Sequence, residues 1–77
     1  MLTFEHSNSD EKIEIHLDKK GIEELTKILS NLSKQPNSEH SHLMTKEWSG
    51  SELSSEKQND SDEYKLINHV KIMFWNE

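Results

Sequence analysis

The chain has 77 residues, of which 30% are hydrophobic and 31% are charged, and its formal net charge is −6. This length allows one small domain, residues 1–77, with a marginal core, because a small protein buries a limited share of its surface. The absence of cysteine excludes disulfides and thiolate metal sites. All nine cations are lysines, and an acidic chain without arginine is a poor candidate for binding nucleic acid.

The sequence shows no membrane or secretion signal. No apolar segment approaches the length that crosses a bilayer. The first residues, MLTFEHSNSDEK, have neither the basic start nor the apolar run of a signal peptide. We therefore expect a cytoplasmic protein without a membrane partner.

The N-terminal segment predicts a β-hairpin. Apolar and polar side chains alternate over residues 2–6 and again over 12–17, the pattern of half-buried strands. The residues between them, Ser-Asn-Ser-Asp at 7–10, favour a turn because their side chains bond to their own backbone. The second strand carries three aliphatic residues on one face: Ile13, Ile15 and Leu17.

A helix is predicted over residues 19–34. Asp18 is a good N-cap, and Pro36 ends the helix because proline disfavours helical backbone in the residue before it. Apolar residues recur at helical spacing and form one stripe: Ile22, Leu25, Ile28, Leu29 and Leu32.

Two further strands are predicted at residues 40–45 and 64–75. The segment between them, 48–63, reads as a long loop with one helical turn near 51–56. The order ββαββ predicts a two-layer α+β fold, in which a single helix covers one face of an antiparallel sheet.

Strand parity predicts the face that points away from the helix. The helix is expected to cover the second and last strands through Ile13, Ile15, Leu17, Leu66, Val70, Ile72 and Phe74. If Leu43 points into the core, the open face then carries four of the five histidines, with methionine and tryptophan beside them: His16, His40, His42, Met44, His69, Met73 and Trp75.

Three interpretations of this face stay open. A His-x-His pair directs both imidazoles to the same side, so His40 and His42 would suit a metal if His16 or His69 completed the set. A mixture of tryptophan, methionine and histidine is also typical of a protein-binding surface. The third interpretation is structural, with these side chains packed beneath the 47–63 loop.

Most of the net charge lies in residues 47–63, which hold six acids and one lysine for a net charge of −5. Such a run is either a solvated acidic loop or a contact surface for a basic partner, since complementary potentials orient docking. Catalysis has little support, because there is no cysteine, nucleophile elbow or phosphate-cradling glycine loop. We expect a protein that is not an enzyme, has no catalytic residues and uses no cofactor.

The segment 40–54 carries the motif H-x-H-L-M-T-x-x-W-x-G-x-E-L-S, and its matching residues are His40, His42, Leu43, Met44, Trp48, Gly50, Glu52, Leu53 and Ser54. It is similar to a motif of the immunity protein 32 family of bacterial polymorphic toxin systems, and His69-Val70-Lys71-Ile72 looks like that family's closing strand. With the preceding strand–helix pattern, the resemblance covers most of the chain. One departure is Ser49, since motifs of this kind often read Trp-Gly-Gly.

Membership of this family would imply a small cytoplasmic antidote. Such a protein binds a cognate effector toxin, often a nuclease or other enzyme delivered by a contact-dependent secretion system, and so protects the producing cell and its kin. The resemblance does not specify the toxin, because the pairing of family members with toxins varies.

The leading hypothesis is an immunity protein that occludes the active site or substrate surface of a toxin with a basic surface. The expected partner-binding residues are His40, His42, Trp48, Glu52, Glu56, Asp60, Asp62, Glu63, His69 and Trp75, and no metal ligand is assigned. One alternative is a small metal-binding or sensor module that uses His16, His40, His42 and His69. Another is a self-associating structural domain, for example a homodimer that pairs through its last strand.

Overall fold

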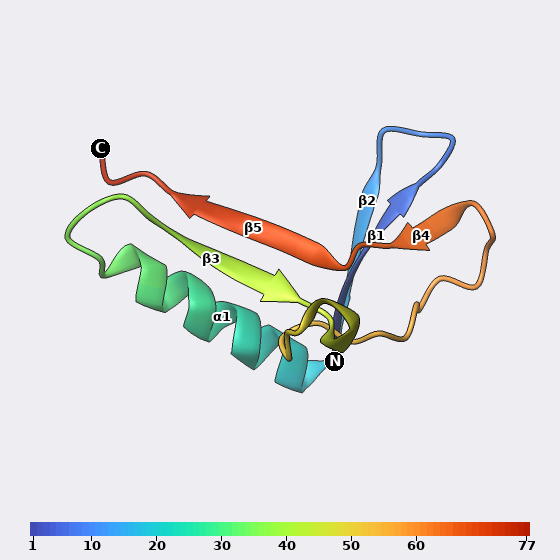
Figure 1. Ribbon diagram of the computed structural model, residues 1–77, viewed down its shortest axis with the longest axis horizontal. Helices are drawn as coiled ribbons and strands as arrows, with labels where there is room; N and C mark the ends of the chain where they lie inside the picture. Colours follow the sequence, from blue (N-terminus) through green and yellow to red (C-terminus); the bar gives the residue numbers. More distant parts are fainter.

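The computed structural model describes all residues, 1–77, and shows an α+β fold (Figure 1). The elements in chain order are β1 (Leu2–Ser7), β2 (Ile13–Leu17), α1 (Lys19–Ser33), β3 (Glu39–Met44), a 3₁₀ turn η1 (Lys46–Trp48), β4 (Tyr64–Leu66) and β5 (His69–Phe74). The predicted α+β class and the ββαββ order are confirmed. The helical turn expected near 51–56 is not formed, and η1 lies earlier in the chain instead.

The strands form two antiparallel sheets instead of the single sheet that the sequence suggests. One sheet has three strands in the order β2-β1-β4, and the other pairs β3 with β5. The predicted last strand is divided between them at Asn68, whose carbonyl and side chain accept hydrogen bonds from the Thr45 amide (3.0 Å) and Thr45 Oγ1 (2.7 Å). The Ile67 amide still donates to the Phe4 carbonyl (2.8 Å). The chain therefore leaves one sheet and enters the other within two residues.

Helix α1 follows β2 directly and ends within one residue of its predicted end. Asp18 is the N-cap, and its Oδ1 accepts hydrogen bonds from the Gly21 amide (2.8 Å) and from the N-terminal ammonium (2.7 Å). Figure 1 shows α1 lying alongside β3, on one side of the two-stranded sheet. The open face of that sheet is thus the face that points away from the helix.

The core lies where the helix, both sheets and the long loop meet. Leu2, Leu43 and Leu53 form its buried centre. The half-buried side chains packed around them are Phe4, Leu17, Leu25, Ile28, Val70 and Ile72. Val70 and Ile72 therefore face the core as predicted, and Leu53 brings the long loop into it.

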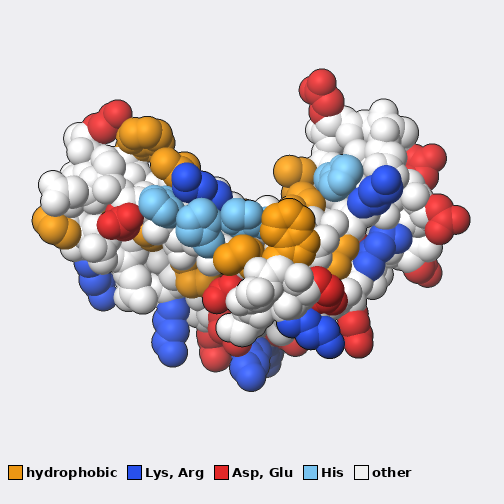
Figure 2. All heavy atoms as spheres, viewed as in Figure 1, with side chains coloured by type: hydrophobic (Ala, Val, Ile, Leu, Met, Phe, Trp, Pro, Cys, Tyr) orange, Lys and Arg blue, Asp and Glu red, His pale blue; other side chains and the backbone are white.

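The expectation that the helix covers the apolar face of β2 is wrong for two of its three residues. Ile13 is 61% exposed and Ile15 is 52% exposed, whereas Leu17 packs against the core. The hairpin β1–β2 extends away from the helix in Figure 1, so only its base, near the start of α1, is covered. Figure 2 shows the result as a hollow between two lobes of the molecule.

Candidate functional site

Alternate residues of β3 and β5 form an exposed face on the side of the two-stranded sheet that points away from α1. The strand register pairs His40 with Met73, His42 with Lys71 and Met44 with His69, so all six side chains lie on that side. We call this set, together with Trp48 of η1, the histidine face. Figure 2 shows histidine side chains next to one another on the visible surface, with hydrophobic side chains beside them.

The aromatic rings of the histidine face are in contact with one another. Nδ1 of His42 lies 2.8 Å from Nε2 of His69, a hydrogen bond in which one ring donates and the other accepts. The His40 ring meets the His42 ring edge-on, with centroids 4.9 Å apart. The Trp48 ring lies 6.0 Å from that of His69. These contacts make a row of four rings that crosses from β3 through β5 to η1.

The pKa of His42 is lowered from its ordinary value. Partial burial of the ring is the main cause, and the positive potential of His40, His69 and Lys71 adds to it. The hydrogen bond between His42 and His69 needs one of the two facing nitrogens to carry a free lone pair, and the lowered pKa favours a neutral His42 ring, which can supply it. Lys71 contributes a lysine side chain to the same face, opposite His42.

A tight corner after β3 holds Trp48 in place. The carbonyl of buried Thr45 accepts hydrogen bonds from the Trp48 amide and from the Gly50 amide, both at 2.9 Å. Ser49, between them, has a positive φ of 68°, the left-handed region that favours glycine. Ser49 therefore adopts the left-handed backbone although it is not a glycine.

Gly50 lies where any side chain would collide with the backbone. A Cβ atom at this position would be 2.4 Å from the Met44 carbonyl oxygen and 2.6 Å from the Met44 Cβ. Glu52 then closes the corner, because its Oε1 accepts a hydrogen bond from the Met44 amide (3.0 Å). That backbone hydrogen bond lowers the pKa of Glu52 below its ordinary value, against the opposing effect of burial. The Glu52 side chain thus links the residues that follow the corner to the end of β3.

The acidic loop is ordered and follows the three-stranded sheet. Its anchor is Glu5, a fully buried residue of β1 whose carboxylate accepts hydrogen bonds from Thr3 Oγ1 (2.6 Å), the Gln58 amide (2.8 Å) and the Asn59 amide (2.9 Å). Burial raises the pKa of Glu5, but these three hydrogen bonds outweigh it and the pKa is lowered overall. Asn59 Nδ2 also donates to Glu14 Oε1 (2.9 Å).

Sequence reasoning missed Glu5. A glutamate at an alternate position of an amphipathic strand predicts a solvent-facing side chain, and no local signal reveals that the loop covers it. The burial of the neighbouring Thr3 and Ser7 is equally unexpected, since both lie on the polar face of β1. The loop therefore covers the face of this sheet that carries Thr3, Glu5 and Ser7, with Leu66 opposite Glu5, whereas Ile13 and Ile15 on the other face stay exposed.

The predicted partner-binding residues fall on separate surfaces. His40, His42, Trp48 and His69 come together on the histidine face, and Trp75 is exposed just beyond the end of β5. The remaining exposed acids lie on the 54–63 segment over the other sheet: Glu56, Asp60, Asp62 and Glu63. Of these, Glu63 accepts a hydrogen bond from Ser9 Oγ.

The four-histidine set considered for a metal is not assembled. His16 lies on β2 in the other sheet, where its Nε2 is 2.9 Å from Glu14 Oε1. Nowhere are three or more histidine, cysteine, aspartate or glutamate side chains arranged so that they could hold a metal ion.

No helix has the length and apolar character needed to cross a bilayer.

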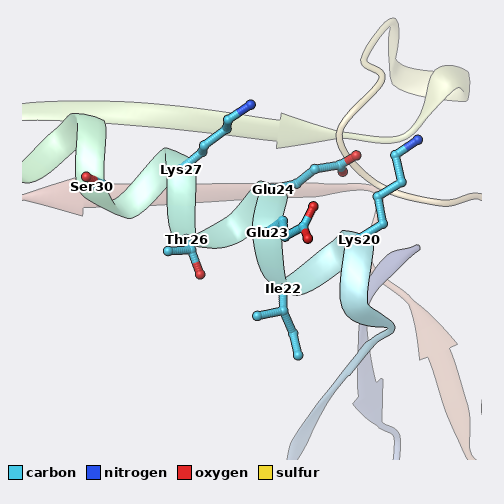
Figure 3. Close-up of a pocket in the computed structure, with 7 residues that line it drawn as sticks. All are labelled: Lys20, Ile22, Glu23, Glu24, Thr26, Lys27 and Ser30. Carbon is cyan, nitrogen blue, oxygen red and sulfur yellow. The ribbon is translucent and has the colours of Figure 1, made fainter.

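The largest surface hollow lies along the outside of α1 and has a volume of about 590 Å³. Its lining residues, Lys20, Ile22, Glu23, Glu24, Thr26, Lys27 and Ser30, all belong to that one helix (Figure 3). It does not include any residue of the histidine face, of which only His40 lines a surface hollow, a smaller one of about 250 Å³ between α1 and β3. Comparison of the chain with protein-family models, with curated proteins and with solved structures finds no match.

Proposed function

We propose that this chain is a cytoplasmic immunity protein, which binds a cognate secreted bacterial toxin and occludes its active site or substrate surface. The observation that carries the proposal is the histidine face, where exposed histidine, tryptophan and methionine side chains are gathered on one side of a sheet. Tryptophan and methionine are enriched at protein–protein interfaces, and tryptophan is prominent among the residues that contribute most to binding. The resemblance of residues 40–54 to an immunity-protein motif supports the same function.

Trp48 is the best candidate for the central contact. Its side chain is 54% exposed, although its backbone is fixed by the Thr45 carbonyl and the left-handed Ser49. A tryptophan whose backbone is already fixed loses less conformational freedom on binding than one on a mobile loop. Trp48 therefore presents apolar area to a partner at low entropic cost, with His69 as its support.

The acidic loop contributes in a different way. Glu56, Asp60 and Asp62 are exposed and lie on a lobe apart from the histidine face. Rim charges of this kind mainly accelerate the encounter with an oppositely charged surface and have less effect on how tightly the complex holds. In this proposal they steer the protein toward the basic cleft of a toxin, for example a nuclease, and the histidine face makes the close contacts.

The first test of the proposal is binding to the product of an adjacent toxin-like reading frame, measured by calorimetry with the purified pair. Replacing Trp48 with alanine is expected to weaken binding by about 30-fold or more, because interface tryptophans typically contribute about 2 kcal/mol when they are central. Glu23→Ala, on the helix and away from the histidine face, is the control and should bind normally. Unchanged affinity of Trp48→Ala would contradict the assigned surface, and failure of the wild-type chain to bind would contradict the function.

The second test separates steering from contact. The triple variant Glu56→Gln, Asp60→Asn and Asp62→Asn is expected to bind more slowly, by about 10-fold at low salt, with a nearly unchanged dissociation rate. Its association rate should also depend less on salt concentration. Glu52 and Glu63 are left intact because both make hydrogen bonds within the protein. Stopped-flow kinetics at several salt concentrations measures these rates. An unchanged association rate would show that the acidic loop does not accelerate binding.

A further inference from the structure

The core of this protein is open on one side. On the three-stranded sheet, the register places Leu2 opposite Leu17, Phe4 opposite Ile15 and His6 opposite Ile13, all on the same face. The first of these pairs is in the core and Phe4 packs against it, but the isoleucines are more than half exposed. The same apolar face thus continues out of the core into solvent.

Helix α1 borders this opening with further aliphatic residues. Leu25 and Ile28 pack against the core, whereas Ile22 is 50% exposed and Leu29 is 48% exposed. In Figure 3, Ile22 points to the flank of the helix opposite the one toward which Lys27 extends beside β3. We call the four exposed residues Ile13, Ile15, Ile22 and Leu29 the open apolar side.

The surface area of the chain is larger than a folded monomer of its size should have. Its solvent-accessible surface is 5538 Å², whereas a compact protein of this mass exposes about 4900 Å². Its radius of gyration, 13.4 Å, also exceeds the value of about 11.5 Å expected for a domain of 77 residues. The excess, roughly 600 Å², approaches the roughly 800 Å² that each partner buries in a standard protein interface.

We propose that a second copy of this chain covers the open apolar side, so that the protein is a symmetric homodimer. Only four hydrophobic residues are buried in the single chain: Leu2, Leu32, Leu43 and Leu53. Such a small core needs further apolar burial whenever the chain is folded. A second copy of the chain is always present with the first and can supply it. The cover must also bind aliphatic side chains, which matches the more apolar character of homodimer interfaces.

The charge distribution allows two copies to meet at this side despite the net charge of −6 on each. The segment that carries most of that charge is hydrogen-bonded through Gln58 and Asn59 to Glu5, which lies on the opposite face of the three-stranded sheet. Helix α1, in contrast, has three lysines against two glutamates. The two acidic loops would therefore lie on the outside of the dimer, where their repulsion is weakest.

This inference does not depend on the proposed toxin binding, because the open apolar side and the histidine face share no residue. The test is sedimentation equilibrium of the full chain from low to high micromolar concentration, together with its thermal unfolding midpoint. We expect a mass of twice 9.1 kDa and a midpoint that rises with protein concentration, since dimerisation stabilises the folded state by mass action. A wild-type mass of 9.1 kDa at every concentration, with a constant midpoint, would overturn the proposal, and any apolar partner would then be a different molecule.

Two matched variants identify the surface. Ile15→Glu is expected to weaken the dimer by about 100-fold or more, because it would bury an unpaired charge in the apolar interface. Met73→Glu alters a similarly exposed residue on the histidine face and should leave the dimer intact. If Ile15→Glu does not fold, Leu29→Glu takes its place with the same expectation. A dimer that Ile15→Glu and Leu29→Glu both leave intact, or that Met73→Glu dissociates, would refute the assigned surface.

Discussion

Replacing Glu5 with alanine is expected to lower the free energy of unfolding by about 3 kcal/mol and to release the 54–63 segment from the sheet. The change removes the acceptor of three hydrogen bonds inside the protein, including those from the Gln58 and Asn59 amides. A loss of this size is a large fraction of the stability of a small domain. Chemical denaturation measures the loss, and hydrogen exchange at the two amides reports release of the segment.

The control for this prediction is Glu56→Ala, which removes an exposed glutamate from the same segment. It should change the stability by less than about 0.5 kcal/mol, as surface substitutions usually do. If both variants had the same stability, or if the Gln58 and Asn59 amides stayed protected in Glu5→Ala, then Glu5 would not be the anchor of the loop.

The role of Glu5 also predicts a pH dependence with a definite sign. Its pKa in the folded state lies below the ordinary value of 4.5, so the folded protein favours the ionised carboxylate more than the unfolded chain does. The contribution of Glu5 is therefore fully present above the ordinary pKa and is lost as the pH falls through the lower, folded-state pKa. The stability difference between wild type and Glu5→Gln should accordingly stay constant from neutral pH down to the ordinary pKa of 4.5 and shrink as the pH falls further, and a constant difference below 4.5 would contradict the lowered pKa.

Replacing Gly50 with alanine is the second substitution with a large expected effect, a loss of about 2 to 3 kcal/mol in the free energy of unfolding. The new Cβ would lie 2.4 Å from the Met44 carbonyl oxygen, a backbone atom that cannot move aside alone. Moving it would disturb the hydrogen bonds that Met44 makes with Leu53 (3.2 Å) and with Glu52. The loss is measured by denaturation, and Trp48 fluorescence in a Trp75→Phe background reports the corner itself.

The neighbouring substitution Ser49→Gly is the matched comparison and should act in the opposite direction. Serine at a φ of 68° is strained, so glycine at this position is expected to stabilise the protein by about 1 kcal/mol. Both substitutions lie in the same turn, but Ser49→Gly relieves a left-handed backbone, whereas Gly50→Ala places a Cβ against the Met44 backbone. If Ser49→Gly destabilised the protein as much as Gly50→Ala, the left-handed corner described here would be wrong.

Local patterns in the sequence were sufficient for the secondary structure of most of the chain. The alternation in β1 and β2, and Asp18 at the start of a regular apolar stripe, each follow from interactions between residues near one another in sequence. The division of the last predicted strand could not be found in this way. Leu66 and Val70 have the same parity across the junction, and only the contact of Asn68 with Thr45 reveals the change of sheet.

Part of the candidate site could also be predicted from local patterns in the sequence. Parity places His40, His42 and His69 on one face, because β3 and β5 pair directly. The alternation of residues also predicted that Ile15 would be buried beneath the helix, and this prediction is wrong. Alternation shows which residues share a face of a strand, but it does not show which face another element packs against. The burial of Glu5 depends on the path of a distant loop, which leaves no periodic signal in the sequence.

The junction at Asn68 has a consequence for how the chain folds. Strands β4 and β5 are separated by only two residues, yet each completes a different sheet. Neither sheet can then be finished before contacts distant in sequence have formed, such as those of His6 with Lys65 and of His40 with Met73. Non-local pairing of this kind slows folding. Because one short segment supplies a strand to both sheets, we expect both sheets to form in a single kinetic phase of folding and to unfold as one cooperative unit.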